Sequence, residues 1–350
     1  MTRRLRFVLA LFVSGAFCAC QQPQQPIFEQ SDGRGALVWP APPDAPRIRY
    51  IGMLSGEASL KARKTGGEVF RELLSGPIEK AVFVTPNAVA ARGDRVYVAD
   101  GQAGSVYELD LAARTFKSIR GAGGGPLAWP ADVCLADDTL AVCDSGRSAV
   151  FLLDLDGRTR RVFGEGLLQR PSAVTYRRAS GEWWVLDAAL HAVIVFDRDG
   201  QVVRRFGTRG GGPGQFNFAA GLTMDARLGA VIADSMNFRV QFFDAEASES
   251  AAEPVRMFGR KGDSAGDFAL PRDVAVDSDG HLYVLDSQFE NVQIFEPDGR
   301  LLLAFGEEGD GPGQFSLPSG ISIDSQDRIW VADTYNRRIQ VFQYLREEGQ

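Results

Sequence analysis

The sequence is poor in the residue types that most often bind metals or act as nucleophiles. Its 350 residues include only two histidines, His191 and His281, and four cysteines. No His-x-His, Cys-x-x-Cys or His-Glu-x-x-His spacing occurs, so we expect no zinc site. The net charge is −7. A chain this acidic lacks the basic face that phosphate binding needs, so we expect no nucleic-acid partner.

The first twenty residues have the features of a secretory signal. Arg3, Arg4 and Arg6 precede an apolar run, residues 7–17, that is too short to span a bilayer. The next residues include Cys18, Ala19 and Cys20, and they resemble the end of a bacterial lipoprotein signal, in which a cysteine is acylated. Cys20 is the predicted lipidation site because the small Ala19 precedes it. Cys18, or a plain signal peptide, is the alternative.

The signal predicts the location of the protein in the cell. Residues 1–19 would be removed, and the Gln- and Pro-rich stretch that follows predicts a flexible tether over residues 20–45. The resemblance implies a secreted protein of the bacterial cell envelope, an outer-membrane lipoprotein that faces the periplasm or the cell surface. Its lipid anchor would be its one contact with the membrane.

One pattern recurs six times in the rest of the chain: an apolar strand, a turn, a second apolar strand that ends in Asp, a polar turn and a third strand. The Asp markers are Asp100, Asp144, Asp187, Asp234, Asp286 and Asp333, with spacings of 44, 43, 47, 52 and 47 residues. That period is typical of a four-stranded propeller blade. The second strands are apolar on both faces, which requires sheets stacked between neighbours. The sequence therefore predicts an all-β, six-bladed β-propeller.

The last repeat supplies only three strands before it ends near residue 344. Residues 46–54 have strand character, and we predict that they form the outer strand of the last blade and close the ring. Residues 55–85 would form a linker with a short helix at Glu68–Leu74, residues 86–344 the repeats, and residues 345–350 a tail.

The later repeats resemble a known family. Leu317–Asp324, Ile329–Asp333 and Asn336–Phe342 together look like an NHL repeat, and so do Pro271–Phe295 and Asp234–Phe242. The first three repeats lack the Asn and Arg that follow the Asp marker. The resemblance implies an NHL/TolB-like propeller. Ubiquitin ligation accompanies NHL repeats in some animal proteins, but this sequence has no RING cluster of Cys and His.

The loop face of the predicted propeller holds the first group of candidate binding residues. We interpret the Asp markers themselves as turn residues, since Asp accepts hydrogen bonds from turn amides. The loops beside them carry aromatic and Arg side chains of the kind that binding surfaces use. These predicted ligand-binding residues of the loop face are Arg147, His191, Phe238, Arg239, Arg272, Phe289, Tyr335 and Arg337.

Asp132 and Asp273 begin first strands in opposite blades, where they would line the central channel. Carboxylates of this kind hold a central calcium in related six-bladed hydrolases and lactonases, so a channel Ca²⁺ is the cofactor to consider. The leading hypothesis is a non-enzymatic scaffold that binds a protein, peptide or glycan. The alternative is a propeller hydrolase, lactonase or lyase with a channel metal.

Two cysteines, Cys134 and Cys143, remain in the body of the chain. With a two-residue turn at 138–139 they would stand opposite each other on adjacent strands. A disulfide can form in an oxidising compartment. We favour the alternative that they are two small buried residues, because other repeats place Ala, Thr or Leu at these positions.

Overall fold

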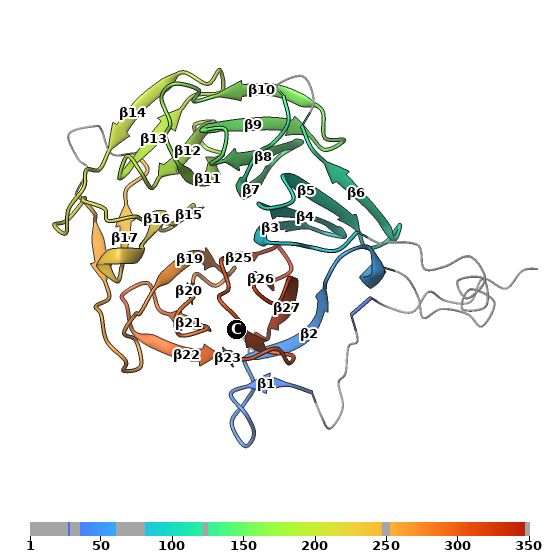
Figure 1. Cartoon of the computed structure of the whole chain (residues 1–350). Helices are drawn as coiled ribbons and strands as arrows, with labels where there is room; N and C mark the ends of the chain where they lie inside the picture. Colours follow the sequence, from blue (N-terminus) through green and yellow to red (C-terminus); the bar gives the residue numbers. More distant parts are fainter. Residues whose placement is uncertain (1–26, 29–35, 61–80, 122–124, 247–252, 347–350) are drawn as a thin grey trace, which may run out of the picture.

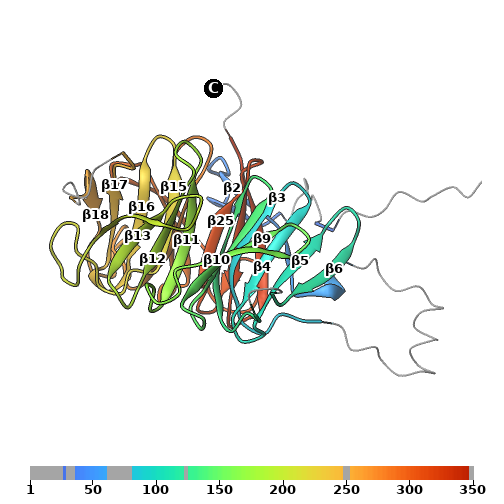
Figure 2. The same cartoon turned by 90° about the horizontal axis from the view of Figure 1, so that it is seen from above.

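Six antiparallel sheets stand around a central axis, and each is a blade of a β-propeller (Figure 1). The computed structural model describes residues 27–28, 36–60, 81–121, 125–246 and 253–346. Seen from above, the strands of the blades run along the axis, with loops at both faces of the ring (Figure 2). The predicted fold class is confirmed.

The blades follow the sequence around the ring, and in each the first strand lines the axis. Blade 1 holds β3 (Pro86–Arg92), β4 (Arg95–Asp100), β5 (Ser105–Asp110) and β6 (Thr115–Ile119). Blade 2 holds β7 (Pro130–Ala136), β8 (Thr139–Asp144), β9 (Ala149–Asp154) and β10 (Thr159–Phe163). Blade 3 holds β11 (Pro171–Arg177), β12 (Glu182–Asp187), β13 (Ala192–Phe196) and β14 (Val202–Phe206).

Blade 4 holds β15 (Gly221–Asp225), β16 (Gly229–Asp234), β17 (Arg239–Phe243) and β18 (Arg256–Phe258), with a 3-10 turn, η2 (Ser235–Asn237). Blade 5 holds β19 (Pro271–Val276), β20 (Leu282–Asp286), β21 (Asn291–Phe295) and β22 (Leu301–Phe305). The short strands β23 (Glu307–Glu308) and β24 (Gln314–Phe315) pair in the linker to the last blade. Blade 6 holds β25 (Gly320–Ile323), β26 (Arg328–Asp333) and β27 (Arg338–Tyr344).

The ring is closed by the N-terminal strand, as predicted. Strand β2 (Ile48–Leu54) pairs antiparallel with β27, from Ile48 opposite Tyr344 to Leu54 opposite Ile339. It thus supplies the fourth strand that the last repeat lacks. A 3-10 turn, η1 (Glu57–Leu60), follows it. Closure of this kind ties the two ends of the repeat region together by backbone hydrogen bonds.

Part of the segment expected to be a tether is docked on the ring. Strand β1 (Val38–Trp39) adds a fifth strand to blade 6 by pairing with β2. Trp39 packs against Phe305 and Phe342, with ring centroids 5.7 and 5.8 Å apart, and Phe28 packs on Trp330. The prediction of a tether up to residue 45 was wrong here, because a few apolar side chains outweigh the polar composition of the stretch.

Other predictions fall outside the described residues. These are the signal at 1–19, the lipidation site Cys20, the helix at Glu68–Leu74 and the end of the tail at 347–350. Among the helices that the structure describes, none is long and apolar enough to cross a membrane.

The hydrophobic core lies between blades rather than inside any one of them. One cluster joins Ala88, Tyr97 and Val106 of blade 1 to Val142 and Phe151 of blade 2, all of them buried. Five further clusters fill the other interfaces around the ring, including the one between blades 6 and 1. Each sheet is therefore buried on both faces, which explains why its strands are apolar on both sides.

The Asp markers are structural, as interpreted. All six are fully buried. Asp144 accepts hydrogen bonds from the amides of Ala128 and Trp129, which precede the first strand, and from those of Gly146 and Arg147 in the next turn. Each marker carboxylate thus fixes the loops at the end of its blade, a role that Asp also has in isolated turns.

The two blades with the full Asp-x-x-Asn-x-Arg pattern add an internal Arg. Arg338 donates to Asp333 at 2.7 Å and to the carbonyls of Asp310, Gly311 and Gln314. Arg239 makes the corresponding bonds to Asp234 and to the Gly-rich linker of blade 4. The guanidinium groups of Arg239 and Arg338 therefore hold the Gly-rich linkers of their blades through hydrogen bonds to linker carbonyls.

The two cysteines do not face each other. The turn between β7 and β8 falls at residues 137–138, so Cys134 pairs with Ala141 and Cys143 pairs with Asp132. Both thiols are free. Burial raises the pKa of Cys134 to about 12. The assumed turn was displaced by one residue, which shifts the pairing by two, and the favoured reading of two small residues without a disulfide agrees with the structure.

Candidate functional site

The mouth of the central channel is built from equivalent positions in all six blades. In blades 1, 2, 3 and 5 a β-bulge follows the Pro that begins the first strand. A bulge redirects the side chain at its extra residue. The bulge positions Asn87, Ala131, Ser172 and Arg272, with Ala220 and Ser319 at the matching positions of blades 4 and 6, all line the mouth. Only one of these six side chains is charged.

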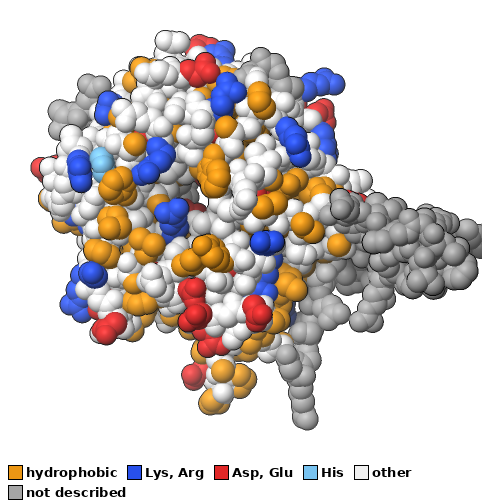
Figure 3. Space-filling model, in the orientation of Figure 1, with side chains coloured by type: hydrophobic (Ala, Val, Ile, Leu, Met, Phe, Trp, Pro, Cys, Tyr) orange, Lys and Arg blue, Asp and Glu red, His pale blue; other side chains and the backbone are white. Residues whose placement is uncertain are grey.

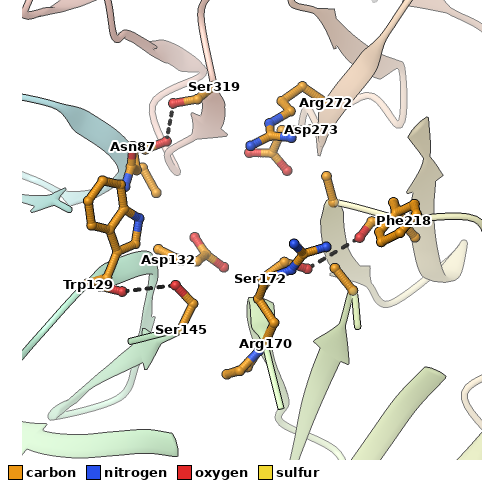
Figure 4. Close-up of a pocket in the computed structure, with 17 residues that line it drawn as sticks. Asn87, Trp129, Asp132, Ser145, Arg170, Ser172, Phe218, Arg272, Asp273 and Ser319 are labelled. Atoms are coloured by element: carbon orange, nitrogen blue, oxygen red, sulfur yellow. Dashed lines mark hydrogen bonds between the residues drawn. The ribbon is translucent and has the colours of Figure 1, made fainter. Parts of the chain in front are cut away.

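A second set of side chains stands above this ring on consecutive blades. Trp129, Arg170 and Phe218 each come just before the first strand of blades 2, 3 and 4 and line the same cavity. The amides of Trp129 and Arg170 are fixed by the Asp markers Asp144 and Asp187. The cavity has a volume of about 340 Å³. Figure 4 shows the guanidinium groups of Arg170 and Arg272 turned toward its centre.

Asp132 and Asp273 lie deeper, at the waist of the channel. They border both the mouth and a second cavity of about 270 Å³ toward the opposite face. Asp132 accepts from the amide of Val133 on its own strand and from Val174 of the next blade, each at 2.8 Å. Asp273 does the same with Val274 and with Ile321 of blade 6. Each carboxylate therefore joins two neighbouring blades.

The surroundings of these carboxylates disfavour their charge. Burial raises the pKa of Asp132 to about 7 against the opposing effect of its two backbone hydrogen bonds. Burial, followed by the charge of Asp132 across the channel, raises the pKa of Asp273 to about 8. The channel waist thus carries only part of its formal negative charge at neutral pH.

The channel residues do not fit a protein-held calcium ion. Ca²⁺ takes about six to eight oxygen ligands, whereas the waist offers two carboxylates, and both oxygens of each already accept a backbone N–H. Within the described ranges, no group of three or more His, Cys, Asp or Glu side chains is placed to hold a metal ion. The hydrogen bonds to backbone N–H groups of two neighbouring blades explain the positions of Asp132 and Asp273 without a metal.

Of the eight predicted ligand-binding residues, only Arg272 lines the cavity. Arg239 lies in the interior of blade 4, because it is 8% exposed and its guanidinium is bonded to Asp234 and to linker carbonyls. Arg147 donates to the carbonyl of Pro126 and lies over the Phe151 ring, away from the mouth. Phe238 and Phe289 are half-buried, whereas Tyr335 and Arg337 are exposed.

His191 does not line the cavity but contacts Phe218, which does. It is 8% exposed, and its Nδ1 accepts a hydrogen bond from the amide of Phe218 at 3.3 Å. Its ring meets the Phe218 ring edge-on with centroids 4.8 Å apart. Burial lowers the pKa of His191, and the nearby Arg209 lowers it further. A neutral His191 therefore holds Phe218 in place.

Sequence reasoning missed Trp129, Arg170 and Phe218. Trp129 and Arg170 directly precede a Pro that begins a first strand, and Phe218 occupies the equivalent place in blade 4. The residue before the Pro that begins a first strand recurs along the sequence, and this pattern could have identified the positions of Trp129 and Arg170. Most of the predicted binding residues come instead from the loops after the Asp markers, which lie outside the cavity lining.

The face around the mouth is mixed in character. Figure 3 shows Lys and Arg side chains and hydrophobic side chains gathered around the central hollow. Trp129 is 43% exposed and Phe218 38% exposed, which is high for aromatic side chains of this size. Exposed aromatics beside arginines are typical of binding surfaces rather than of inert loops.

Comparison with known proteins agrees with this architecture. The family model of the NHL repeat matches residues 268–296 and 315–342. The chain carries NHL repeats. RING finger protein nhl-1 of Caenorhabditis elegans is 39% identical over 83 residues, which are 22% of this chain and only 8% of that protein. The match therefore spans only a small part of that relative.

Two solved structures show the same propeller at low sequence identity. An auxiliary nutrient binding protein from Bacteroides thetaiotaomicron is 14% identical with a TM-score of 0.58, over 75% of this chain and 69% of that one. A streptogramin B lyase is 10% identical with a TM-score of 0.55, over 75% of this chain and 94% of that one. Likeness at this level concerns the fold alone, since one fold hosts many functions.

Proposed function

We propose that this chain is a propeller lipoprotein of the bacterial cell envelope that binds a ligand at the loop-face mouth of its channel and does not catalyse a reaction. The observation that carries the proposal is the cavity itself. It combines a volume of about 340 Å³ with two exposed aromatic side chains and two arginines on a rigid ring. Concave sites with apolar walls and a few convergent polar groups are typical of ligand binding.

The chemistry of the lining favours binding over catalysis. No histidine or cysteine lines the cavity, among the residues that the structure describes. The hydroxyl groups of Ser145, Ser172 and Ser319 donate to backbone carbonyls. A nucleophile needs an adjacent base that accepts its proton, and within the described residues none of these serines hydrogen-bonds to a His, Asp or Glu side chain.

A photo-reactive amino acid placed in the mouth tests the binding proposal. It would replace Phe218 in one variant and Val203, a similarly exposed residue on the outer strand of blade 3, in the control. Irradiation of intact cells should give one discrete product from position 218 that is absent from position 203. A mouth position that gives no product, or the same products as the control, would contradict the proposal.

The proposed lipid attachment to the cell envelope is tested separately. The pattern around Cys20 supports lipidation, and metabolic labelling with a palmitate analogue should mark the wild type and Cys18→Ala but not Cys20→Ala. Labelling that is lost in Cys18→Ala instead would assign the anchor to the other cysteine, and an unlabelled wild type would mean a plain signal.

The enzymatic alternative rests on a bound divalent metal. Metal analysis of the purified protein distinguishes the two functions, because a ligand-binding mouth predicts no stoichiometric metal. One Ca²⁺ for each chain that is lost in Asp132→Asn would overturn the binding proposal in favour of channel chemistry.

A further inference from the structure

The two arginines of the mouth are close enough to influence each other. Arg170 belongs to blade 3 and Arg272 to blade 5, and both point into the same cavity (Figure 4). Burial lowers the pKa of Arg272, the adjacent Asp273 opposes this shift, and the positive charge of Arg170 adds a smaller lowering effect. The fold therefore places two positive charges at one cavity, where an anion between them would interact favourably with both.

Within the described residues, the guanidinium donors of these two arginines have no hydrogen-bond acceptor. Asn87 and Ser319 donate to the neighbouring blades, at the carbonyls of Pro130 and Asn87, and Ser172 does so at Ala219. By contrast, neither the Arg170 nor the Arg272 guanidinium donates a hydrogen bond or forms an ion pair in the part of the chain that the structure describes. The polar groups of the mouth that stabilise the ring are thus separate from those available to a ligand.

Phe218 preorganises one of the two. The Arg170 guanidinium lies over the Phe218 ring at 5.3 Å, and the backbone amide of Arg170 is fixed by Asp187. Stacking covers one face of the guanidinium and leaves the N–H groups at its edge free to point into the cavity. A planar fork of this kind matches a carboxylate or a phosphate in geometry.

The deeper carboxylates offset this positive charge only in part. Asp132 and Asp273 lie below the arginines and each is engaged by two backbone amides. Their raised pKa values leave the waist partly protonated at neutral pH. The two guanidinium groups are therefore the charged groups of the mouth that remain available to an anion, although the whole chain is acidic.

Trp129 supplies an apolar wall on the blade before Arg170. Its indole ring fits against Gly101, where a Cβ atom would lie 2.7 Å from Trp129 Cε2. The absence of a side chain at Gly101 thus gives the indole its place. At 43% exposure the ring offers a flat apolar surface to a ligand.

We infer that the mouth binds a small anionic ligand that carries a carboxylate or a phosphate ester beside a flat apolar group, with Arg170 and Arg272 on the anion and Trp129 against the flat group. This rests on the proposed function, since it names the ligand class of the same site. The cavity of about 340 Å³ limits the ligand to a small molecule or to one end of a longer one.

Quenching of tryptophan fluorescence tests the charge of the mouth. Iodide, caesium and acrylamide are an anionic, a cationic and a neutral probe, and Trp129→Phe identifies the contribution of that residue. Iodide should quench Trp129 more strongly than caesium at low salt. The ratio of iodide to acrylamide quenching should fall by at least about two-fold in Arg170→Gln/Arg272→Gln. Stronger quenching by caesium than by iodide would overturn the inference.

Thermal shifts with small probes test recognition. Benzoate or phenyl phosphate should raise the melting temperature of the wild type, whereas benzamide, which has the same ring without the charge, should not. The two anions distinguish a carboxylate from a phosphate site. The shift should be lost in Arg170→Gln and in Arg272→Gln and kept in Arg205→Gln, a matched change on the exposed outer strand β14. Arg272→Lys controls for folding and should recover part of the shift.

The outcomes separate the inference from the function on which it rests. Equal stabilisation by benzamide and benzoate, unaffected by the Arg variants, would refute an anion site while the mouth still binds ligands. Shifts that are absent with all probes would also refute it. If the photo-reactive residue at position 218 then also gives no product, the proposed function fails as well.

Discussion

Replacing Asp144 with Ala should destabilise blade 2 and displace Trp129 at the mouth. The carboxylate is fully buried and accepts four backbone N–H groups at 2.7–3.0 Å. A hydrogen bond to a charged group contributes about 1.5–3 kcal/mol, and two of the donors, Gly146 and Arg147, lie in a turn that water can reach. We therefore expect the free energy of unfolding to fall by about 3–6 kcal/mol.

Asp144→Asn refines the test. Its amide can replace Oδ2 and would then oppose only the N–H of Ala128, while Oδ1 keeps its three donors. The loss should be about 1–3 kcal/mol. Urea unfolding followed by circular dichroism measures both variants, and tryptophan fluorescence reports the position of Trp129.

Asp138→Ala serves as the control, since Asp138 is exposed and contacts Arg160 and Thr139 at the surface. Its stability should stay close to that of the wild type. If Asp144→Ala is no less stable than Asp138→Ala, the marker carboxylates do not hold the loops at the ends of the blades.

Three further changes have outcomes that follow from the structure. Asp273→Asn should flatten the pH dependence of stability. The native pKa of about 8 lies above the ordinary value, so the stabilisation by this group is complete in acid and is lost as the pH rises to about 8. Urea unfolding between about pH 5 and pH 9 should therefore show the wild type losing stability relative to the variant, and parallel curves would contradict the raised pKa. Arg338→Met should cost about 3–5 kcal/mol by leaving Asp333 buried without its partner, whereas Arg337→Met, at the exposed neighbour, should cost little, and equal effects in thermal melts would contradict the internal role of Arg338. Gly221→Ala should lower the melting temperature and disturb the channel waist, because its Cβ would lie 2.5 Å from the Asp273 Cα. An unchanged melting temperature in that variant would show that the two blades can separate there.

The sequence determined the fold on its own because the fold is periodic. Six Asp markers at a nearly constant spacing and strands apolar on both faces leave stacked four-stranded blades as the arrangement that buries them. The missing fourth strand of the last repeat even identified β2 as the strand that closes the ring. Local chemistry was also sufficient to predict the structural role of the Asp markers, since a carboxylate at a strand end has turn amides within hydrogen-bonding distance.

Only the tertiary structure decided the site. Arg170 and Arg272 are about a hundred residues apart, and nothing in the local sequence shows that both enter one cavity. Arg239 and Arg337 follow similar Asp markers, yet the first is buried in an ion pair and the second is exposed. A one-residue difference in position moves a side chain to the other face of a strand. Which side chains meet around the axis depends on bulges, register and the closure of the ring, and these are properties of the whole propeller.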